Sequence, residues 1–136
     1  MQNLIFEPIN DLERALLQAQ EGHISIPALL DIFLSSQFFV LIDKEIPPAG
    51  WDNSISMMVL SGSGGDPMLA VFTASQRSSG WPKQYPQFAF GLLVDFKWLL
   101  KGTVPGSGMV VNPGWKVGLE IPPSGLQKLK TKALST

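Results

Sequence analysis

The residues that could carry chemistry are few, and they do not form a catalytic pattern. His23 is the only histidine, and no Gly-x-Ser-x-Gly sequence occurs that could present a serine nucleophile to it. Nucleophilic catalysis needs a nucleophile within hydrogen-bond reach of a base. His23, which follows Gly22, is therefore better interpreted as a loop or helix-capping residue. We predict that the protein is not an enzyme.

The sequence also offers no pattern for a metal or a phosphate-bearing cofactor. The chain has no cysteine and one histidine, so only an all-oxygen metal site remains, and Asp43 and Glu45 flank Lys44 as at a solvated strand end. Residues 62–65, Gly-Ser-Gly-Gly, are not followed by the Lys-Ser/Thr of a phosphate-binding loop. We expect no metal, no cofactor and a hairpin loop over 61–67.

Two polar positions remain as candidates for a structural or a ligand-binding role. Arg77, one of two arginines, lies beside Ser75 and Ser78. Its guanidinium could tie a turn to backbone carbonyls or receive an anionic group, and we favour the structural role. Asn112 begins an Asn-Pro-Gly turn, in which its side chain can hydrogen-bond the nearby backbone. A small-ligand or regulatory pocket near Arg77 and Asn112 is the alternative.

These positions need a scaffold, which the periodicity of the sequence predicts. Asn10 and Glu13 have the form of a capping box that begins a helix over 11–21, and Ser25 can cap a second helix. Pro123 suits the first position of a final helix, whose inner face would hold Leu126, Leu129 and Leu134. Short β-rich runs predict strands at 38–42, 55–60, 68–73, 109–111 and 117–121.

A further helix is predicted over 91–100, ending at Lys101-Gly102. Val94 and Trp98 fall on its far side, where either another part of the chain covers them or they form a contact surface with Lys101 at the rim. Tryptophan is enriched at binding hot spots, and because the chain is poor in charged residues we favour the contact surface. On a helical wheel, five apolar side chains form the inner stripe of this helix, namely Leu92, Leu93, Phe96, Leu99 and Leu100.

The predicted elements make one α+β domain over residues 1–136. We expect a mixed, largely antiparallel sheet of four or five strands, with helices packed mainly on one face. A sheet covered on both faces is the alternative.

Composition restricts the partners. Hydrophobic residues make up 45% of the chain and charged residues 15%, against about 25% in an average soluble domain. Apolar area beyond what a core can hold is most often covered by another protein. The net charge of −1 implies no basic face for nucleic acid, and no stretch reaches the ~18 apolar residues of a membrane span. We expect a protein partner or self-association, with a homodimer as one form, and neither nucleic acid nor a membrane.

Four short motifs follow one another in an order that resembles the N-terminal domain of the SseB family, bacterial proteins named for enhanced serine sensitivity. They are the opening helix at 8–16, the start of the second helix at 26–30, the strand and turn at 71–77, and the late strand ending in Asn-Pro-Gly at 109–114. Together they span nearly the whole chain. The resemblance implies no catalytic residues and no cofactor.

The function expected from the sequence is that of a non-enzymatic protein-interaction module. The absence of cysteine fits the reducing bacterial cytoplasm, and residues 1–8 lack the basic and apolar regions of a secretory signal.

Overall fold

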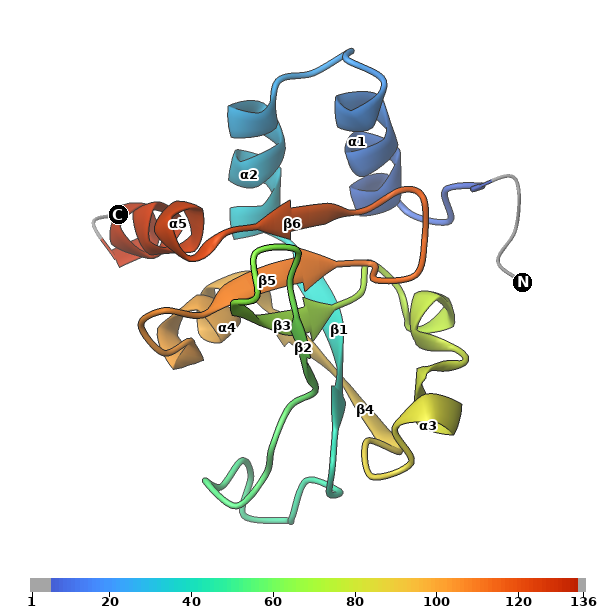
Figure 1. Cartoon of the computed structure of the whole chain (residues 1–136), viewed down its shortest axis with the longest axis vertical. Helices are drawn as coiled ribbons and strands as arrows, with labels where there is room; N and C mark the ends of the chain where they lie inside the picture. The colour runs from blue at the N-terminus through green and yellow to red at the C-terminus, as the bar shows by residue number, and fades with distance from the viewer. Residues whose placement is uncertain (1–5, 135–136) are drawn as a thin grey trace.

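The computed structural model describes residues 6–134 and shows six strands in two sheets (Figure 1). One sheet pairs β1 with β4, and the other has the order β2-β3-β5-β6. Of the four strand pairs, β3–β5 is parallel and the others are antiparallel. The predicted α+β class with mixed, largely antiparallel pairing is confirmed. The strands are β1 (Gln37–Ile42), β2 (Val59–Ser61), β3 (Pro67–Val71), β4 (Phe90–Asp95), β5 (Gly108–Val111) and β6 (Leu119–Ile121).

Capping residues set the starts of the first two helices. Asn10 Oδ1 accepts the Glu13 N–H at 2.8 Å and caps the first helix, and Ser25 Oγ accepts the Ala28 N–H at 3.2 Å and caps the second. The first helix ends at Gln20, and Gly22 follows its C-cap with a φ of 84°. The helices are α1 (Asp11–Gln20), α2 (Ile26–Leu34), α3 (Trp81–Gln84), α4 (Phe96–Gly102) and α5 (Pro123–Leu134), with a 3₁₀ turn, η1 (Ser75–Ser78).

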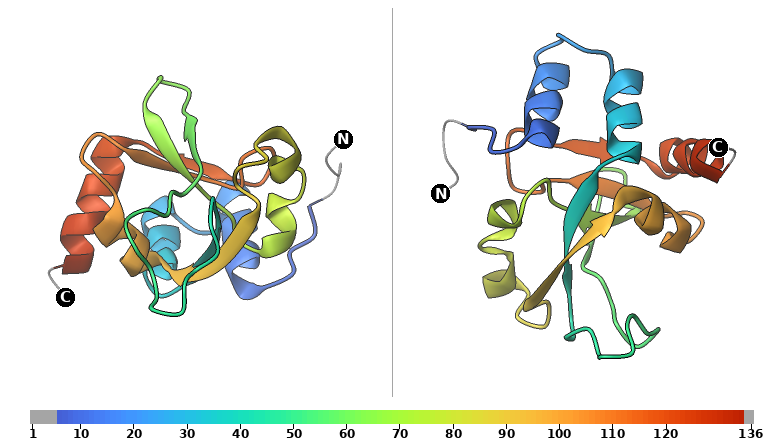
Figure 2. Two further views of the ribbon diagram at one scale, coloured as in Figure 1. Left: turned by 90° about the horizontal axis from the view of Figure 1, so that it is seen from below. Right: turned by 180° about the vertical axis from the view of Figure 1, so that it is seen from behind.

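Strand alternation divides the apolar side chains between two faces. Phe38, Val40 and Ile42 of β1 point into the main core, which also receives side chains from α1, α2, α4 and α5. Leu41 and Phe39 point the other way, into a smaller cluster that the segment around α3 covers. Figure 2 shows α1, α2, α4 and α5 grouped around the strands, with α3 apart from them. Most of the helical packing is therefore on one face, as predicted.

The final helix begins at Pro123, and Leu126 and Leu129 are buried in the main core. The side chain of Leu134 lies outside the described residues. None of the helices within residues 6–134 is long and apolar enough to cross a membrane.

The helix predicted over 91–100 is wrong in its first half. Phe90–Asp95 forms strand β4 against β1, and only Phe96–Gly102 is helical. The apolar run fits both the helix and the strand period. Pairing with β1 favours the strand because it hydrogen-bonds the backbone and places Leu92 and Val94 against the main core. Gly91 lies directly under the ring of Phe39, since a Cβ there would come within 1.9 Å of its Cζ atom.

Candidate functional site

A buried polar cluster is built on an ion pair between Glu13 and Arg77. Arg77 donates from Nε to Glu13 Oε2 at 2.8 Å and from Nη2 to Oε1 at 2.7 Å. The Glu13 side chain is 0% exposed and the Arg77 side chain 7%. Two parallel charge-assisted hydrogen bonds are the strongest arrangement that a guanidinium and a carboxylate can make. The pair joins the first turn of α1 to η1, 64 residues along the chain.

Aromatic rings and backbone groups surround Arg77. Its guanidinium carbon lies 4.0 Å from the ring centroid of Phe6 and 4.6 Å from that of Trp115. Nη2 also donates to Glu7 O at 2.7 Å, and the Trp115 indole N–H donates to Arg77 O at 2.8 Å. Cation–π contacts strengthen when the cation is removed from water, as it is here. The charge is thus held by the chain itself and is not presented to solvent.

Thr73 and Asn112 extend the cluster to the sheet. The Thr73 hydroxyl donates to Glu13 Oε2 at 2.5 Å and accepts from Asn112 Nδ2 at 2.9 Å. Asn112 Oδ1 accepts the Thr73 N–H at 2.9 Å, and its Nδ2 also donates to Val117 O at 3.1 Å. Asn112 adopts a φ of 55°, which asparagine tolerates better than most residues. Four elements therefore meet at this point: α1, the end of β3, η1 and the end of β5.

Glu13 remains ionised inside this cluster. Burial alone would raise its pKa, but hydrogen bonds from Arg77, Thr73 and the Ile9 N–H, together with the positive charge of Arg77, outweigh burial and lower the pKa below its usual value. In the described residues no buried side-chain nitrogen or oxygen lacks a hydrogen-bond partner. The cluster is chemically a cross-link whose polar groups are occupied by one another.

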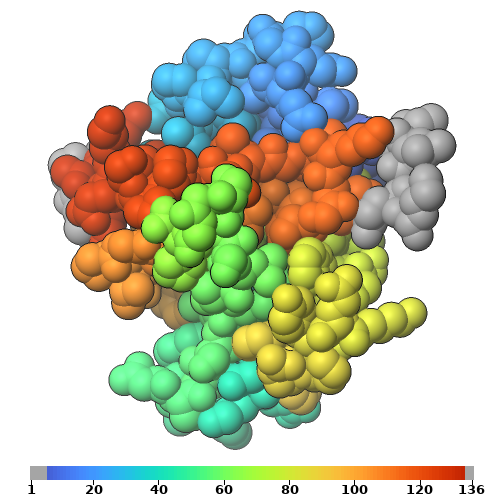
Figure 3. Space-filling model, viewed as in Figure 1, coloured from blue at the N-terminus to red at the C-terminus, as the bar shows by residue number. Residues whose placement is uncertain are grey.

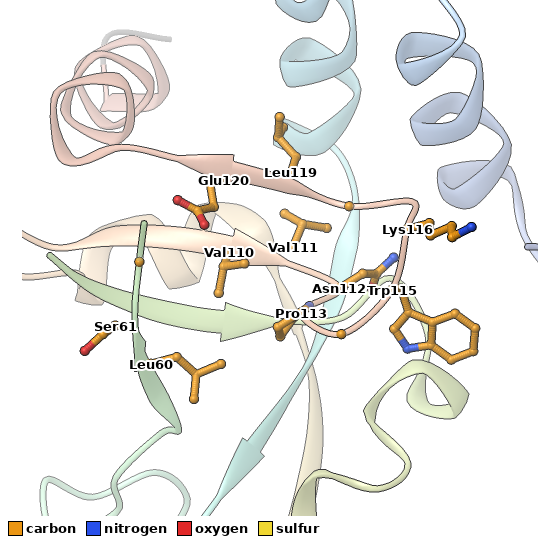
Figure 4. Close-up of a pocket in the computed structure, with 13 residues that line it drawn as sticks. Leu60, Ser61, Val110, Val111, Asn112, Pro113, Trp115, Lys116, Leu119 and Glu120 are labelled. Carbon is orange, nitrogen blue, oxygen red and sulfur yellow. The ribbon is translucent and has the colours of Figure 1, made fainter. Parts of the chain in front are cut away.

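An open hollow of about 400 Å³ lies beside the cluster (Figure 4). Leu60 and Val110 supply apolar lining and Glu120 supplies a carboxylate, whereas the amine of Lys116, another lining residue, points away from these side chains. Asn112 is one of the lining residues and Arg77 is not, so the structure brings the two candidates into one network but only one of them to the hollow. The loop that bears Trp115 packs between α1 and the segment around α3 (Figure 3).

The three predicted interface residues lie on two different elements, Val94 on strand β4 and Trp98 and Lys101 on helix α4. Val94 is half-buried against the main core, so the far-side placement that suggested it is wrong. Trp98, on α4, is 39% exposed and makes an edge contact with Trp51 at 5.1 Å between ring centroids. Lys101 is exposed at the end of the same helix.

His23 is exposed just after the end of α1, where its N–H donates to Gln18 O at 2.8 Å. Its charged neighbour is Glu21, at 3.9 Å. Within residues 6–134, no three His, Cys, Asp or Glu side chains gather in a way that could hold a metal ion.

The comparison with protein families matches residues 12–128 to the SseB protein N-terminal domain. The chain belongs to the SseB family. This confirms the resemblance carried by the four short motifs. No curated protein and no solved structure gave a significant match. In this SseB domain, the matched residues include Glu13, Thr73, Arg77 and Asn112.

Sequence reasoning found Arg77 and Asn112 but missed Glu13 and Thr73 as their partners. Glu13 was interpreted only as the third residue of a capping box, and it does accept the Ile9 N–H at 3.1 Å. The sequence does contain one signal for such a partner. Arg77 follows a buried strand, and an arginine that is buried there needs an acidic partner. The separation of 64 residues hides which acid it is.

Replacing Glu13 with Gln should destabilise the fold by about 3 to 5 kcal/mol at neutral pH, because the Arg77 charge then stays buried without a counter-ion. Urea denaturation measures this. Asp11→Asn, which removes an exposed pair with Arg14, is the control and should change stability little.

The same pair predicts an acid dependence of stability. Since the folded-state pKa of Glu13 is lowered, its contribution is complete above the unfolded-state pKa of about 4.3 and disappears as the pH falls through the lower folded-state pKa. The difference in free energy of unfolding between the native protein and Glu13→Gln should therefore become smaller below about pH 4. A difference that stays constant with pH would contradict an ionised Glu13.

Replacing Asn112 with Ala should cost about 2 to 4 kcal/mol, because buried partners lose their hydrogen bonds and alanine disfavours a φ of 55°. Thermal unfolding measures the loss. Asn112→Gly, which tolerates the backbone but lacks the amide, should lose less than Asn112→Ala. Unchanged stability with loss of a specific binding activity would instead place Asn112 in a ligand site.

Proposed function

We propose that this SseB domain is a non-enzymatic protein-interaction module of the bacterial cytoplasm. The observation that carries the proposal is the exposure of large apolar side chains on β4 and α4. Phe90 is 37% exposed, Leu93 55% and Trp98 39%. Phe90 and Leu93 lie on opposite faces of β4, because they are paired with Ile42 of the main core and Phe39 of the smaller cluster. Large apolar side chains left at the surface of a charge-poor chain support contact with another protein.

The disposition of the polar groups supports the same function. The buried acid, arginine, threonine and asparagine hydrogen-bond one another inside the cluster around Arg77. Their hydrogen-bonding capacity is directed at holding α1, β3, η1 and β5 together. Recognition then falls to the surface, where Trp98 offers an indole whose burial would remove apolar area from water at about 25 cal/mol per Å².

A second function, the binding of a small ligand, is favoured by one observation, the hollow lined by Asn112, Trp115, Lys116 and Glu120. It combines apolar lining with the carboxylate of Glu120, as a site for a small polar metabolite would. A thermal-shift screen against metabolites separates the two functions. A concentration-dependent rise in melting temperature, lost in Glu120→Gln, would favour the ligand, whereas a flat screen favours the protein partner.

Replacing Trp98 with Ala should weaken binding of a protein partner by about 2 kcal/mol or more, with a smaller loss of fold stability because the indole is already partly in water. Affinity capture from a bacterial lysate, followed by titration of the captured protein, measures the first quantity, and urea denaturation measures the second. Ile26→Ala, which shortens a 45% exposed side chain on α2, is the matched control and should leave capture unchanged.

Two results would count against the proposed role of Trp98. One is capture that is equal for the native protein and Trp98→Ala. The other is a loss of fold stability of about 3 to 5 kcal/mol, which is the cost of truncating a core aromatic residue and would show that Trp98 with Trp51 is part of the fold.

A further inference from the structure

Strand β4 has an open edge, which follows from the hydrogen bonds of β1. Phe39 exchanges both backbone hydrogen bonds with Phe72, at 2.8 Å each, so its N–H and C=O point toward β3. Neighbouring residues of a strand point their backbone groups to opposite sides, so Val40 and its alternates point to β4. By the β1–β4 register, Leu92 lies opposite Val40 and points its backbone groups back toward β1.

The intervening residues of β4, Gly91 and Leu93, therefore direct their backbone groups away from the sheet. Within the described chain, no hydrogen bond is made by the N–H of either residue. The view from behind shows β4 on the near side of the molecule, with β1 beside it and no further strand along its other edge (Figure 2). An unpaired row of donors and acceptors of this kind is a template for another strand.

The other sheet has outer strands with the usual protection, and β4 does not. β2 and β6 have three residues each, β6 carries Glu120 and is followed by Pro122, and β2 is tied to β6 through the Ser63–Glu120 hydrogen bonds. β4 has six residues, Phe-Gly-Leu-Leu-Val-Asp, with no proline or lysine among them. Short length, charge and proline are the devices that keep edges from pairing. β4 is longer than β2 and β6, and its one charged residue, Asp95, lies at its end, so the edge from Phe90 to Val94 has none of these devices.

We propose that the strand that covers β4 is β4 of a second copy, in an antiparallel pairing that continues the sheet as β1-β4-β4-β1. This inference rests on the proposed interaction function and names a partner for it. An antiparallel edge is complementary to itself, so a two-fold axis near Leu92 places Gly91 of each copy opposite Leu93 of the other. Every N–H and C=O that Gly91 and Leu93 direct outward then has a partner.

Side chains and charge favour this register. The exposed Leu93 side chain of one copy would lie across Gly91 of the other, over which the Phe39 ring already extends, so apolar meets apolar. Asp95 is the only charged residue of β4, and antiparallel pairing keeps the two copies of it at opposite ends. A parallel pairing would set them side by side, where like charges oppose association.

The first test uses the native protein. Sedimentation velocity over a concentration series should show a monomer–dimer equilibrium, and amide hydrogen exchange by NMR should locate it. The amides of Gly91 and Leu93 should exchange more slowly as the concentration rises, while those of Leu92 and Val94, which face β1, should not change. A monomer at all concentrations, or a dimer with no concentration-dependent protection of Gly91 and Leu93, would overturn the proposal.

The second test compares two variants with the same chemical change. Leu93→Lys puts a charge on the open edge and should raise the dimer dissociation constant at least about tenfold, because the two lysines face each other diagonally across the pairing. Val59→Lys, at a 50% exposed position of β2, is the control and should leave the dimer unchanged. A dimer that is equally stable in both variants would place the interface elsewhere.

The two proposals fail separately. If lysate capture depends on Trp98 while the native protein stays monomeric, the interaction function stands and the β4 pairing is wrong. If β4 pairs as described while Trp98→Ala changes no capture, the dimer stands and the role of Trp98 in binding a different protein is wrong. If neither association occurs, both proposals fail.

Discussion

The buried pair of Glu13 and Arg77 is the interaction on which the rest of the structure depends. Taking two charges out of water costs several kcal/mol for each ion, and mutual attraction offsets this only when the remaining hydrogen-bonding capacity is also satisfied. Here the Thr73 hydroxyl and the Ile9 N–H donate hydrogen bonds to the Glu13 carboxylate, and Glu7 O and two aromatic rings surround the Arg77 guanidinium. The pair therefore has all its hydrogen bonds only when α1, the end of β3 and η1 are in one relative position.

This requirement explains where the chain keeps its few charges. With 15% charged residues, the chain places one acid and one of its two arginines in its interior. The surface is left with apolar side chains that a more highly charged protein would replace, and Leu93 and Trp98 are examples. The polar interior and the exposed apolar side chains are thus two consequences of one composition. That link is the physical basis of our proposal that the surface serves recognition while the polar cluster cross-links the fold.

The sequence predicted what depends on neighbouring residues and missed what depends on distant ones. The caps at Asn10 and Ser25 and the left-handed Gly22 just after α1 depend on neighbouring residues, and the structure has them as expected. The segment 90–95 is ambiguous by periodicity, and only its pairing with a strand some 50 residues earlier settles it as β4. Likewise, nothing near Arg77 in the sequence indicates that its partner is Glu13 on the first helix. In both cases the deciding contact has a long sequence separation.

The open edge of β4 also follows from topology. After β4 the chain turns at once into α4, where the Phe96 N–H donates to Ser36 O at 3.0 Å and Phe96 is buried against Phe33 and Phe38. That packing carries the chain across the main core toward β5, in the other sheet, and no later strand within residues 6–134 pairs with β4. On the other side, β1 is held to β3 through Phe39 and Phe72. Among the described strands, β4 pairs with β1 alone. The backbone groups on its other edge can therefore hydrogen-bond to water or to a strand of another molecule.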